Sequence, residues 1–328
     1  MRVITTIIAG ALTATVFGAG AASAQDEVLP AASGYTISGP WRTGPELAQA
    51  RSGLSAAVLD GRIYAAGGSG LVDPRAEVEV YDPEARIWRL GEPLPVGLER
   101  FGMTAAGGRI WVAGGYAAGG GSAPSDQVWS FDPNAGAWQS EPALPGPKAS
   151  FALLSHDDRL YALGGEDGAA GMFVFDPEGQ SWSALPAPAE TARRGAAAVA
   201  HDGEFWLIGG ASEGAASARV DVYDPEAGAW RRGPDLPAPR AGHAAAVIDG
   251  AIHIFGGRSA DLRRTLADHL ALVDGAWTDK PAMVNPRTEA AAAALEGEIW
   301  LIGGGAGAGF FAPFTAVNSV DVVRPAAE

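Results

Sequence analysis

A glycine doublet recurs six times along the chain, each time at the end of a hydrophobic run. Successive doublets are 45 to 50 residues apart. They are Gly67-Gly68, Gly114-Gly115, Gly164-Gly165, Gly209-Gly210, Gly256-Gly257 and Gly303-Gly304. Such a period is typical of proteins built from repeated supersecondary units, in which each unit buries its faces against its neighbours. The repeat therefore constrains the fold more than any single motif does.

Further marks divide each repeat into four strands. An aromatic-Asp-Pro turn follows each of the first four doublets, and a tryptophan stands seven residues after the aromatic. These turns begin at Tyr81, Phe131, Phe175 and Tyr223, and their tryptophans are Trp88, Trp138, Trp182 and Trp230. The fifth unit instead has the shorter turn Asp274-Gly275 before Trp277, which favours a tight hairpin. Upstream of each doublet, a stretch rich in small residues and a turn predict two more strands.

The order of these strands has a packing reason. Strands nearest the axis of a radial array need small side chains such as alanine and glycine, whereas outer strands have room for tryptophan. Over about residues 35–323, the combination of doublet, aromatic-Asp-Pro turn and spaced tryptophan resembles the kelch repeat. That resemblance implies a β-propeller, so we expect an all-β fold with six four-stranded blades.

The two ends of the repeat region indicate how the ring closes. The last strand candidate, residues 317–323, has no tryptophan after it, whereas Trp41 precedes the first small-residue strand. We therefore expect the N-terminal strand around Trp41 to complete the last blade. The chain has no cysteine, so ring closure would stabilise it without disulfides. The lack of cysteine also argues against a kelch-like copper oxidase, because that family's site uses a cysteine crosslinked to tyrosine.

The first residues have the pattern of a secretory signal. Arg2 is followed by the mostly apolar run Val3 to Gly18, and Ala22-Ser23-Ala24 is a small-residue cleavage site. We expect a signal peptide at residues 1–24, a short leader at 25–34 and a single propeller at 35–328. The protein would then be periplasmic or secreted and would not insert into a membrane after cleavage. A membrane anchor is the alternative, although the apolar run is short for that role.

The overall charge argues against nucleic acid and anionic membranes as partners. It is −15 for the full chain, and removing Arg2 with the signal peptide leaves −16. Basic residues nevertheless recur sixteen positions before the first glycine of five doublets. These are Arg51, Lys148, Arg193, Arg240 and Arg287, whereas Arg100 stands fourteen before its doublet, which indicates a slightly shorter hairpin.

We expect these six basic residues to ring the mouth of a central channel. Gathered cations and narrow walls would favour a ligand with anionic groups, and guanidinium groups suit carboxylates. In kelch proteins that bind acidic peptides, the resemblance implies that arginines near this face can hold the ligand's carboxylates. The alternative is structural: the basic groups satisfy carbonyls at blade junctions or pair with acidic neighbours. Those neighbours are Glu46, Glu99, Glu190 and Glu289.

The loops after the doublets are expected to surround the same mouth. The last loop, roughly residues 305–316, contains Phe310, Phe311 and Phe314, which either pack locally or contact a ligand. His243 is the one histidine expected near the channel. The others are His156 and His201 in hairpin turns, and His253 and His269 on strands with no second ligand at metal spacing. The sequence therefore predicts no metal site and no cofactor.

Three classes of function fit this pattern. The favoured one is a monomeric scaffold that holds a protein or glycan ligand through its loop face. The alternative is a carbohydrate-active enzyme, because some exported bacterial kelch propellers isomerise sialic acid. Such an enzyme would need a carboxylate at the channel, for which Glu99, Glu190 and Glu289 are candidates. The third is a structural role in the cell envelope without a small ligand.

Overall fold

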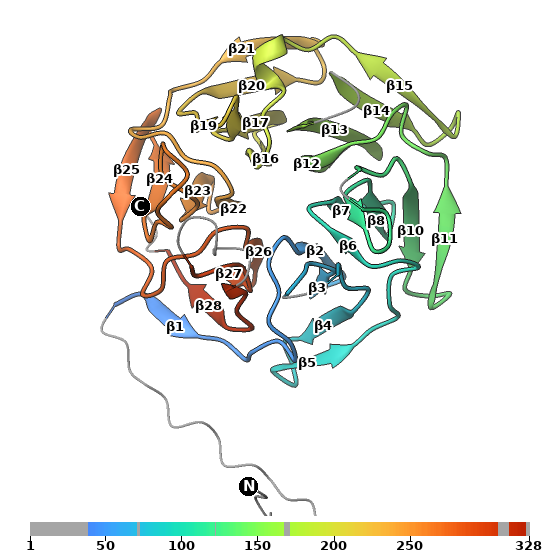
Figure 1. The fold of residues 1–328 in the computed structure, drawn as a ribbon, viewed down its shortest axis with the longest axis horizontal. Coiled ribbons are helices and arrows are strands. Elements are labelled where there is room, and N and C mark those ends of the chain that lie inside the picture. Colours follow the sequence, from blue (N-terminus) through green and yellow to red (C-terminus); the bar gives the residue numbers. More distant parts are fainter. Residues whose placement is uncertain (1–38, 71–72, 122, 167–170, 308–314, 326–328) are drawn as a thin grey trace, which may run out of the picture. The chain divides into compact units, whose positions relative to one another are not determined.

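Six four-stranded antiparallel sheets surround a central channel (Figure 1). The computed structural model describes residues 39–70, 73–121, 123–166, 171–307 and 315–325, all within a unit that spans residues 36–328. We number the sheets as blades 1 to 6, starting with the sheet that contains β2. The predicted six-bladed propeller is confirmed.

Each blade contributes four strands, ordered from the channel outward. Blade 1 contains β2 (Ser55–Leu59), β3 (Arg62–Ala66), β4 (Val78–Asp82) and β5 (Ile87–Leu90), and blade 2 contains β7 (Gly102–Ala106), β8 (Arg109–Ala113), β10 (Val128–Asp132) and β11 (Ala137–Glu141). Blade 3 contains β12 (Ala149–His156), β13 (Arg159–Glu166), β14 (Met172–Asp176) and β15 (Ser181–Leu185), and blade 4 contains β16 (Ala197–His201), β17 (Glu204–Ile208), β20 (Val220–Asp224) and β21 (Ala229–Arg232). Blade 5 contains β22 (Ala244–Ile248), β23 (Ala251–Phe255), β24 (His269–Val273) and β25 (Ala276–Lys280), and blade 6 contains β26 (Ala291–Leu295), β27 (Glu298–Ile302), β28 (Val320–Val323) and β1 (Trp41–Thr43).

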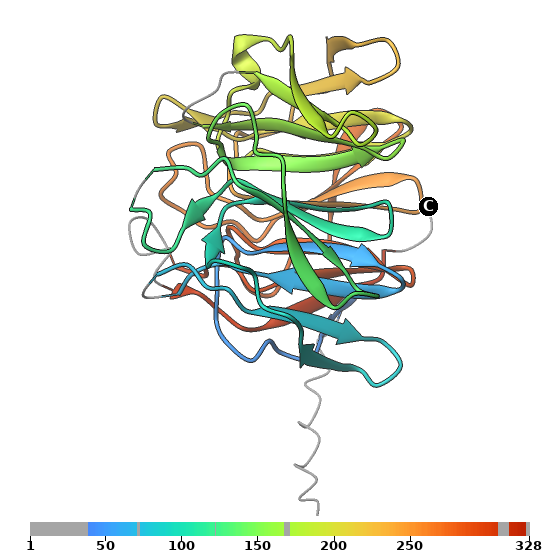
Figure 2. The ribbon, with the colours of Figure 1, turned by 90° about the vertical axis from the view of Figure 1, so that its right-hand side faces the viewer.

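Smaller elements occur in the connections. The ribbons β6 (Leu98–Glu99) with β9 (Tyr116–Ala117) and β18 (Ala211–Ser212) with β19 (Ala215–Ala216) are two-stranded, and η1 (Ala189–Thr191) is a single 3-10 turn. Figure 2 shows the strands running between the two faces of the ring. Within the described ranges, no helix is both long and apolar enough to cross a membrane. The expected signal peptide and leader lie outside the described residues.

The ring closes as predicted. Strand β1 pairs antiparallel with β28, with Trp41 opposite Val323, and completes blade 6. Strand β28 begins at Val320, three residues later than the predicted segment. The Trp41 ring packs at 5.8 Å from that of Phe255 in blade 5. Its indole N–H also donates to the carbonyl of Pro281 at 2.8 Å, so the N-terminal strand is fixed to two blades.

The hydrophobic core lies between neighbouring blades. In one cluster, Tyr81 of blade 1 packs against Trp300 of blade 6 with ring centroids 4.3 Å apart. The inner strands carry alanine and other small residues, as β26 does with four consecutive alanines, because six strands converge at the channel. Aromatic side chains occupy the wider outer part of each junction, which follows the order predicted from the sequence.

The glycine doublets connect each blade to the next. At the junction of blades 6 and 1, Gly303 has φ 59°, and a Cβ there would lie 2.7 Å from the carbonyl oxygen of Arg51. Gly304 donates its N–H to that same oxygen at 2.9 Å. The other five doublets make the equivalent hydrogen bond to the following blade. Glycine is needed here because the backbone of the next blade approaches too closely for a side chain.

The outer tryptophans make a second contact between blades. In four blades, the indole N–H donates to a backbone carbonyl in the connection that enters the same blade from the preceding one. The pairs are Trp88 with Pro45, Trp138 with Glu92, Trp182 with Pro142 and Trp277 with Pro234, at 2.8 to 3.1 Å. Among the described residues, the indole nitrogen of Trp230 in blade 4 has no such acceptor. The connection into this blade is the one that contains η1.

Candidate functional site

Five of the six predicted site residues are buried inside the blades. We call Arg51, Lys148, Arg193, Arg240 and Arg287 the repeat basic residues; each is at most 3% exposed. Every one donates to the carbonyl of the first glycine in its own doublet, as Arg51 does to Gly67 at 3.0 Å and Lys148 to Gly164 at 2.8 Å. These five residues therefore satisfy backbone carbonyls inside the blades, which is the structural alternative considered from the sequence, and they do not ring the channel mouth.

Carboxylates on or beside the third strands complete these buried contacts. The four ion pairs are Arg51–Glu79 at 2.9 Å, Arg193–Asp221 at 2.7 Å, Arg240–Asp268 at 3.0 Å and Arg287–Asp321 at 2.6 Å. Lys148 instead lies over the ring of Phe173, 5.4 Å from its centroid, and burial lowers the pKa of its ammonium to about 8. Of the four acidic neighbours suggested by the sequence, Glu289 pairs with Arg100, whereas the carboxylates of Glu46, Glu99 and Glu190 are not the partners of these buried arginines.

Arg100 is not equivalent to the other five. The hairpin of blade 2 has the same two-residue turn as the others, so the predicted shorter hairpin is wrong. The equivalent position in blade 2 is the fully buried Leu98, whose carbonyl accepts from Gly68. Arg100 stands two residues later, and its side chain is 30% exposed at the channel mouth. Of the predicted set, it alone remains a candidate for direct contact with a ligand.

Arg100 belongs to a closed ring of backbone hydrogen bonds. One residue from each blade entry adopts a left-handed conformation, with φ between 52° and 66°. These residues are Gly53, Arg100, Ser150, Gly195, Gly242 and Glu289. Each N–H donates to the carbonyl of the same position in the preceding blade, at 2.7 to 3.0 Å, and Gly53 accepts from Arg100 while donating to Glu289. The ring thus holds the three members that carry side chains in a fixed order around the channel.

An ion pair connects Arg100 and Glu289, the two ring residues on either side of Gly53. The Arg100 guanidinium donates to both carboxylate oxygens of Glu289 at 3.0 and 3.1 Å, and Glu289 raises the pKa of Arg100. A Cβ on Gly53 would lie only 3.2 Å from Cγ of Arg100, so glycine leaves room for the pair. Arg258 Nη2 lies 3.7 Å from the same carboxylate. Glu289 is therefore shared by two arginines.

The ring opens into a cavity of about 460 Å³, which we call the mouth cavity. Its charged lining residues are Arg100, Arg194, Arg258 and Glu289, and Ser150 and Thr288 add hydroxyl groups. Leu54, Phe101 and Phe151 line both this cavity and the channel beyond it. Three guanidinium groups and one carboxylate make the site positive in a protein of net charge −15. Narrow walls strengthen such a local field.

His243 also lines the mouth cavity, as expected from the sequence. It is 6% exposed, and neither ring nitrogen has a hydrogen-bond partner among the described residues. Burial, together with Arg240 and Arg193, lowers its pKa to about 3, so the imidazole is neutral near pH 7. The connections that enter the other five blades carry an apolar residue at the equivalent position, such as Leu54 or Phe101. A neutral imidazole here can accept or donate a hydrogen bond.

Sequence reasoning missed Arg194 and Arg258. Arg194 directly follows the buried Arg193, and Arg258 directly follows a glycine doublet. In the structure, the residue after a repeat basic residue forms an isolated β-bridge with the residue after a glycine doublet. Arg194 pairs in this way with Ala211, and Arg258 pairs with Ala241. Comparing the residues that directly follow the repeat basic residues and the glycine doublets in all six repeats would have identified both arginines. The predicted aromatics Phe310, Phe311 and Phe314 lie outside the described residues.

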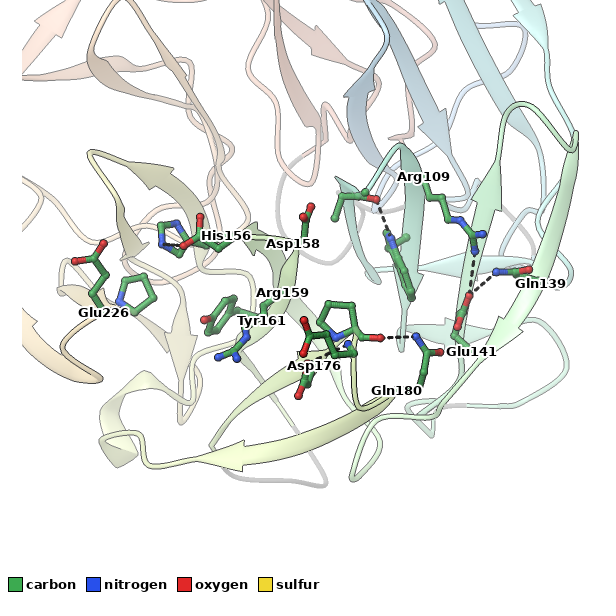
Figure 3. Close-up of a pocket in the computed structure, with 17 residues that line it drawn as sticks. Arg109, Gln139, Glu141, His156, Asp158, Arg159, Tyr161, Asp176, Gln180 and Glu226 are labelled. Atoms are coloured by element: carbon green, nitrogen blue, oxygen red, sulfur yellow. Dashed lines mark hydrogen bonds and ion pairs between the residues drawn. The ribbon is translucent and has the colours of Figure 1, made fainter.

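A larger cavity of about 970 Å³ lies among the hairpin and Asp-Pro turns of blades 2 to 4, at the opposite ends of the strands (Figure 3). Six carboxylates line it against two arginines: Glu141, Asp157, Asp158, Asp176, Glu178 and Glu226 against Arg109 and Arg159. Figure 3 shows Arg109 and Gln139 directed at Glu141, with contacts of 3.7 and 2.8 Å. This acidic lining does not suit an anionic ligand. Among the described residues, no group of three or more metal-ligating side chains is found.

Comparisons with known proteins agree with the repeat. A model described as KLHDC2/KLHL20/DRC7 Kelch-repeats domain matches residues 153–323, and one described as Kelch motif matches residues 50–95 and 99–145. Kelch-like protein 35 from Mus musculus is 30% identical over 181 residues, which cover 55% of this chain and 22% of that protein. Kelch repeat and BTB domain-containing protein 13 from Homo sapiens is 38% identical over 69 residues, or 21% of this chain and 15% of that protein.

The chain thus matches less than a quarter of the length of these two relatives. The shared part is the repeat itself, whose doublets, turns and tryptophans make the contacts between blades. The first model covers more than half of the chain, and the second covers most of blades 1 and 2. This chain belongs to the kelch-repeat family.

Proposed function

We propose that the chain is an interaction scaffold whose mouth cavity binds a carboxylate-bearing segment of a partner protein. Kelch proteins generally mediate protein–protein interactions. The mouth cavity adds chemical selectivity, because Arg100, Arg194 and Arg258 converge there while the opposite cavity is acidic. Guanidinium groups bind carboxylates through two parallel hydrogen bonds. An acidic peptide segment therefore fits the mouth better than a neutral or basic one.

Arg258 is the observation that carries this proposal. Its Nε and Nη2 atoms have no hydrogen-bond acceptor within the described part of the chain, although Nη2 lies 3.7 Å from Glu289. Buried donors without partners are costly in a folded protein. A ligand carboxylate bound in the cavity that Arg258 and Arg194 both line would add an acceptor close to these arginines and offset the positive charge of the mouth.

Catalysis has weaker support than binding. Glu289 is the carboxylate best placed at the channel, but both its oxygens already accept hydrogen bonds from Arg100. Glu99 accepts from the hydroxyl of Ser69, and Glu190 is exposed on η1. A general base needs a free lone pair within reach of the proton that it removes. Glu99 and Glu190 do not line the mouth cavity, and Glu289 is held there by Arg100, so none of the three is placed as a free general base.

The test uses a glutamate-rich peptide and a matched peptide with glutamine at every glutamate position. Wild-type protein should bind the glutamate peptide more tightly, with an affinity that falls as salt is added. Arg258→Ala should weaken this binding about tenfold, the size expected for one charge-assisted hydrogen bond. Isothermal titration calorimetry at two salt concentrations measures both effects.

Arg89→Ala is the matched control, because it removes an exposed guanidinium from the outer strand β5 and should leave binding unchanged. Equal affinity of wild-type protein for the two peptides would contradict the proposal. An equal loss in the Arg89 and Arg258 variants would also contradict it, because the effect would then come from overall charge.

Our proposal for location is export, with residues 1–24 removed as a signal peptide and the protein released to the periplasm or the medium. It is supported by the Arg2 start, the apolar run and the Ala22-Ser23-Ala24 site. The mass of protein recovered from the bacterial periplasm should correspond to a chain that begins at Gln25. Recovery of the intact chain from the cytoplasm alone would reject this proposal.

A further inference from the structure

Blade 5 differs from the other five at two equivalent positions. The third residue of its second strand is His253, whereas the other blades place a large aromatic side chain there. These aromatics are Tyr64, Trp111, Tyr161, Trp206 and Trp300. The strand register supports the alignment, because His253 faces Ala271 as Tyr64 faces Val80 and Trp300 faces Val322.

The second difference lies on the neighbouring strand. His269 begins the third strand of blade 5, where the other blades have an apolar residue. Those residues are Val78, Val128, Met172, Val220 and Val320. His253 and His269 are both at most 4% exposed. Two buried polar side chains have therefore replaced apolar ones at one blade junction, beside the closing strand β1 (Figure 1).

The two imidazoles form a hydrogen-bonded chain. Nδ1 of His253 lies 2.9 Å from Nε2 of His269, and Nδ1 of His269 lies 3.4 Å from the carbonyl oxygen of Pro281. A carbonyl can only accept, so Nδ1 of His269 donates and its Nε2 accepts from His253. Burial lowers the pKa of each imidazole to about 4, so both are neutral near pH 7. The chain leaves Nε2 of His253 unprotonated, with a lone pair that can accept a hydrogen bond.

These replacements open a cavity of about 510 Å³, which we call the blade-5 cavity. His253 is smaller than the aromatic residues of the other blades, and Ala251 replaces the arginine that begins the same strand in blades 1 to 3. Ile248, Leu272 and Val323 supply apolar walls. An apolar cavity of about 150 Å³ is already sufficient to hold benzene. The blade-5 cavity therefore has room for an aromatic ring with substituents.

We propose that the blade-5 cavity binds a small neutral aromatic molecule that carries a hydroxyl group, of the phenol class. The ring would occupy the space that tyrosine or tryptophan fills in the other blades. Its hydroxyl would donate to Nε2 of His253. Lys280 lines the cavity together with Asp249 and Asp274, so the charged lining has no excess of cations and does not favour an anion. This site is separate from the mouth cavity and does not depend on the function proposed for it.

Phenol and toluene are suitable probes, because they have similar size and differ in the hydroxyl group. Calorimetric titration of wild-type protein should show phenol binding at least tenfold more tightly than toluene. His253→Leu keeps an open cavity but removes the acceptor, so phenol should lose this advantage. His253→Tyr restores the residue found in blades 1 and 3 and fills the space, so both probes should bind at least tenfold more weakly.

Ala251→Arg gives a second way to fill the cavity without changing either histidine. It should weaken the binding of both probes even if His253→Tyr does not fold. His201→Leu is the matched control, because it removes a histidine from the end of β16 in blade 4, away from the blade-5 cavity, and should leave the affinity for phenol unchanged. The proposal is overturned if wild-type protein binds phenol no better than toluene. It is equally overturned if the two cavity-filling variants bind phenol as the wild type does.

Discussion

Arg193 and Arg194 are neighbours in sequence, but they belong to two different regions of the molecule. The Arg193 guanidinium is buried in blade 4, where it pairs with Asp221 and donates to the carbonyls of Leu207 and Gly209. Arg194 is exposed and lines the mouth cavity. A basic residue recurs at the position of Arg193 in five blades, whereas an arginine at the position of Arg194 is found in blade 4 alone.

This difference separates structural residues from candidate binding residues. Side chains that recur at one repeat position satisfy the backbone of that repeat, as the repeat basic residues do with the doublet carbonyls. Side chains that depart from the repeat have no such common task. Arg258, His243 and the pair His253–His269 are departures, and all of them line cavities. A departure from an internal repeat is therefore the more informative sign of a site.

The largest effect should come from exchanging these two arginines for alanine. Arg193→Ala should lower the free energy of unfolding by about 3 kcal/mol, because Asp221 and several carbonyls stay buried with fewer partners. Arg194→Ala should change it by less than about 0.5 kcal/mol, as is usual for surface positions. Urea unfolding followed by tryptophan fluorescence measures both. Similar losses in the two variants would remove the distinction between the regions.

An intermediate effect is expected from acid, through the histidines of blade 5. The pKa of His253 and of His269 is about 4 in the folded protein, against 6.5 for a free imidazole. The unfolded chain therefore binds more protons below pH 6.5, and stability is lost as pH falls toward 4. We expect this pair to lose about 2 kcal/mol as pH falls from 6.5 to 5.5, because one pH unit corresponds to at most about 1.4 kcal/mol for each group and each unfolded imidazole is already half protonated at pH 6.5.

The double variant His253→Tyr and His269→Val isolates this contribution, because it gives blade 5 the residues found in other blades. Its free energy of unfolding should depend less on pH between 6.5 and 5 than that of the wild type. Lys280, which also lowers the pKa of both histidines, stays in place as a common background. Parallel urea titrations at several pH values give the comparison, and identical slopes would contradict the assigned pKa values.

The sequence was sufficient to predict the fold because each repeat mark has one physical task. The doublets allow blades to approach, the tryptophans cover the outer junctions, and Trp41 supplies the strand that the last blade lacks. The positions of the repeat basic residues were also predictable from their spacing. Their burial was not, because spacing does not reveal whether a guanidinium turns toward the channel or toward its own blade.

The candidate sites needed strand register. His253 and His269 are sixteen residues apart, and from the sequence neither had a second ligand nearby. They meet because β23 pairs with β24 and places Phe255 opposite His269. Aligning the repeats would have shown both histidines at positions that are otherwise aromatic or apolar. Arg100 shows the opposite error, because its sequence spacing suggested membership of the buried set, whereas its left-handed backbone places it in the mouth.

The smallest effect concerns the left-handed ring, where Ser150 and Gly242 share one backbone conformation with φ of 54° and 66°. Ser150→Gly should raise the free energy of unfolding by about 0.5 kcal/mol, because relief of left-handed strain slightly exceeds the entropy that glycine adds to the unfolded chain. Gly242→Ser should lower it by about 1 kcal/mol, since a Cβ there would lie 2.7 Å from Oγ1 of Thr288. Thermal unfolding at neutral pH resolves the two signs. Equal destabilisation of both variants would contradict this prediction. It would mean that each ring position needs its own native residue and that glycine is not generally favoured in the shared left-handed conformation.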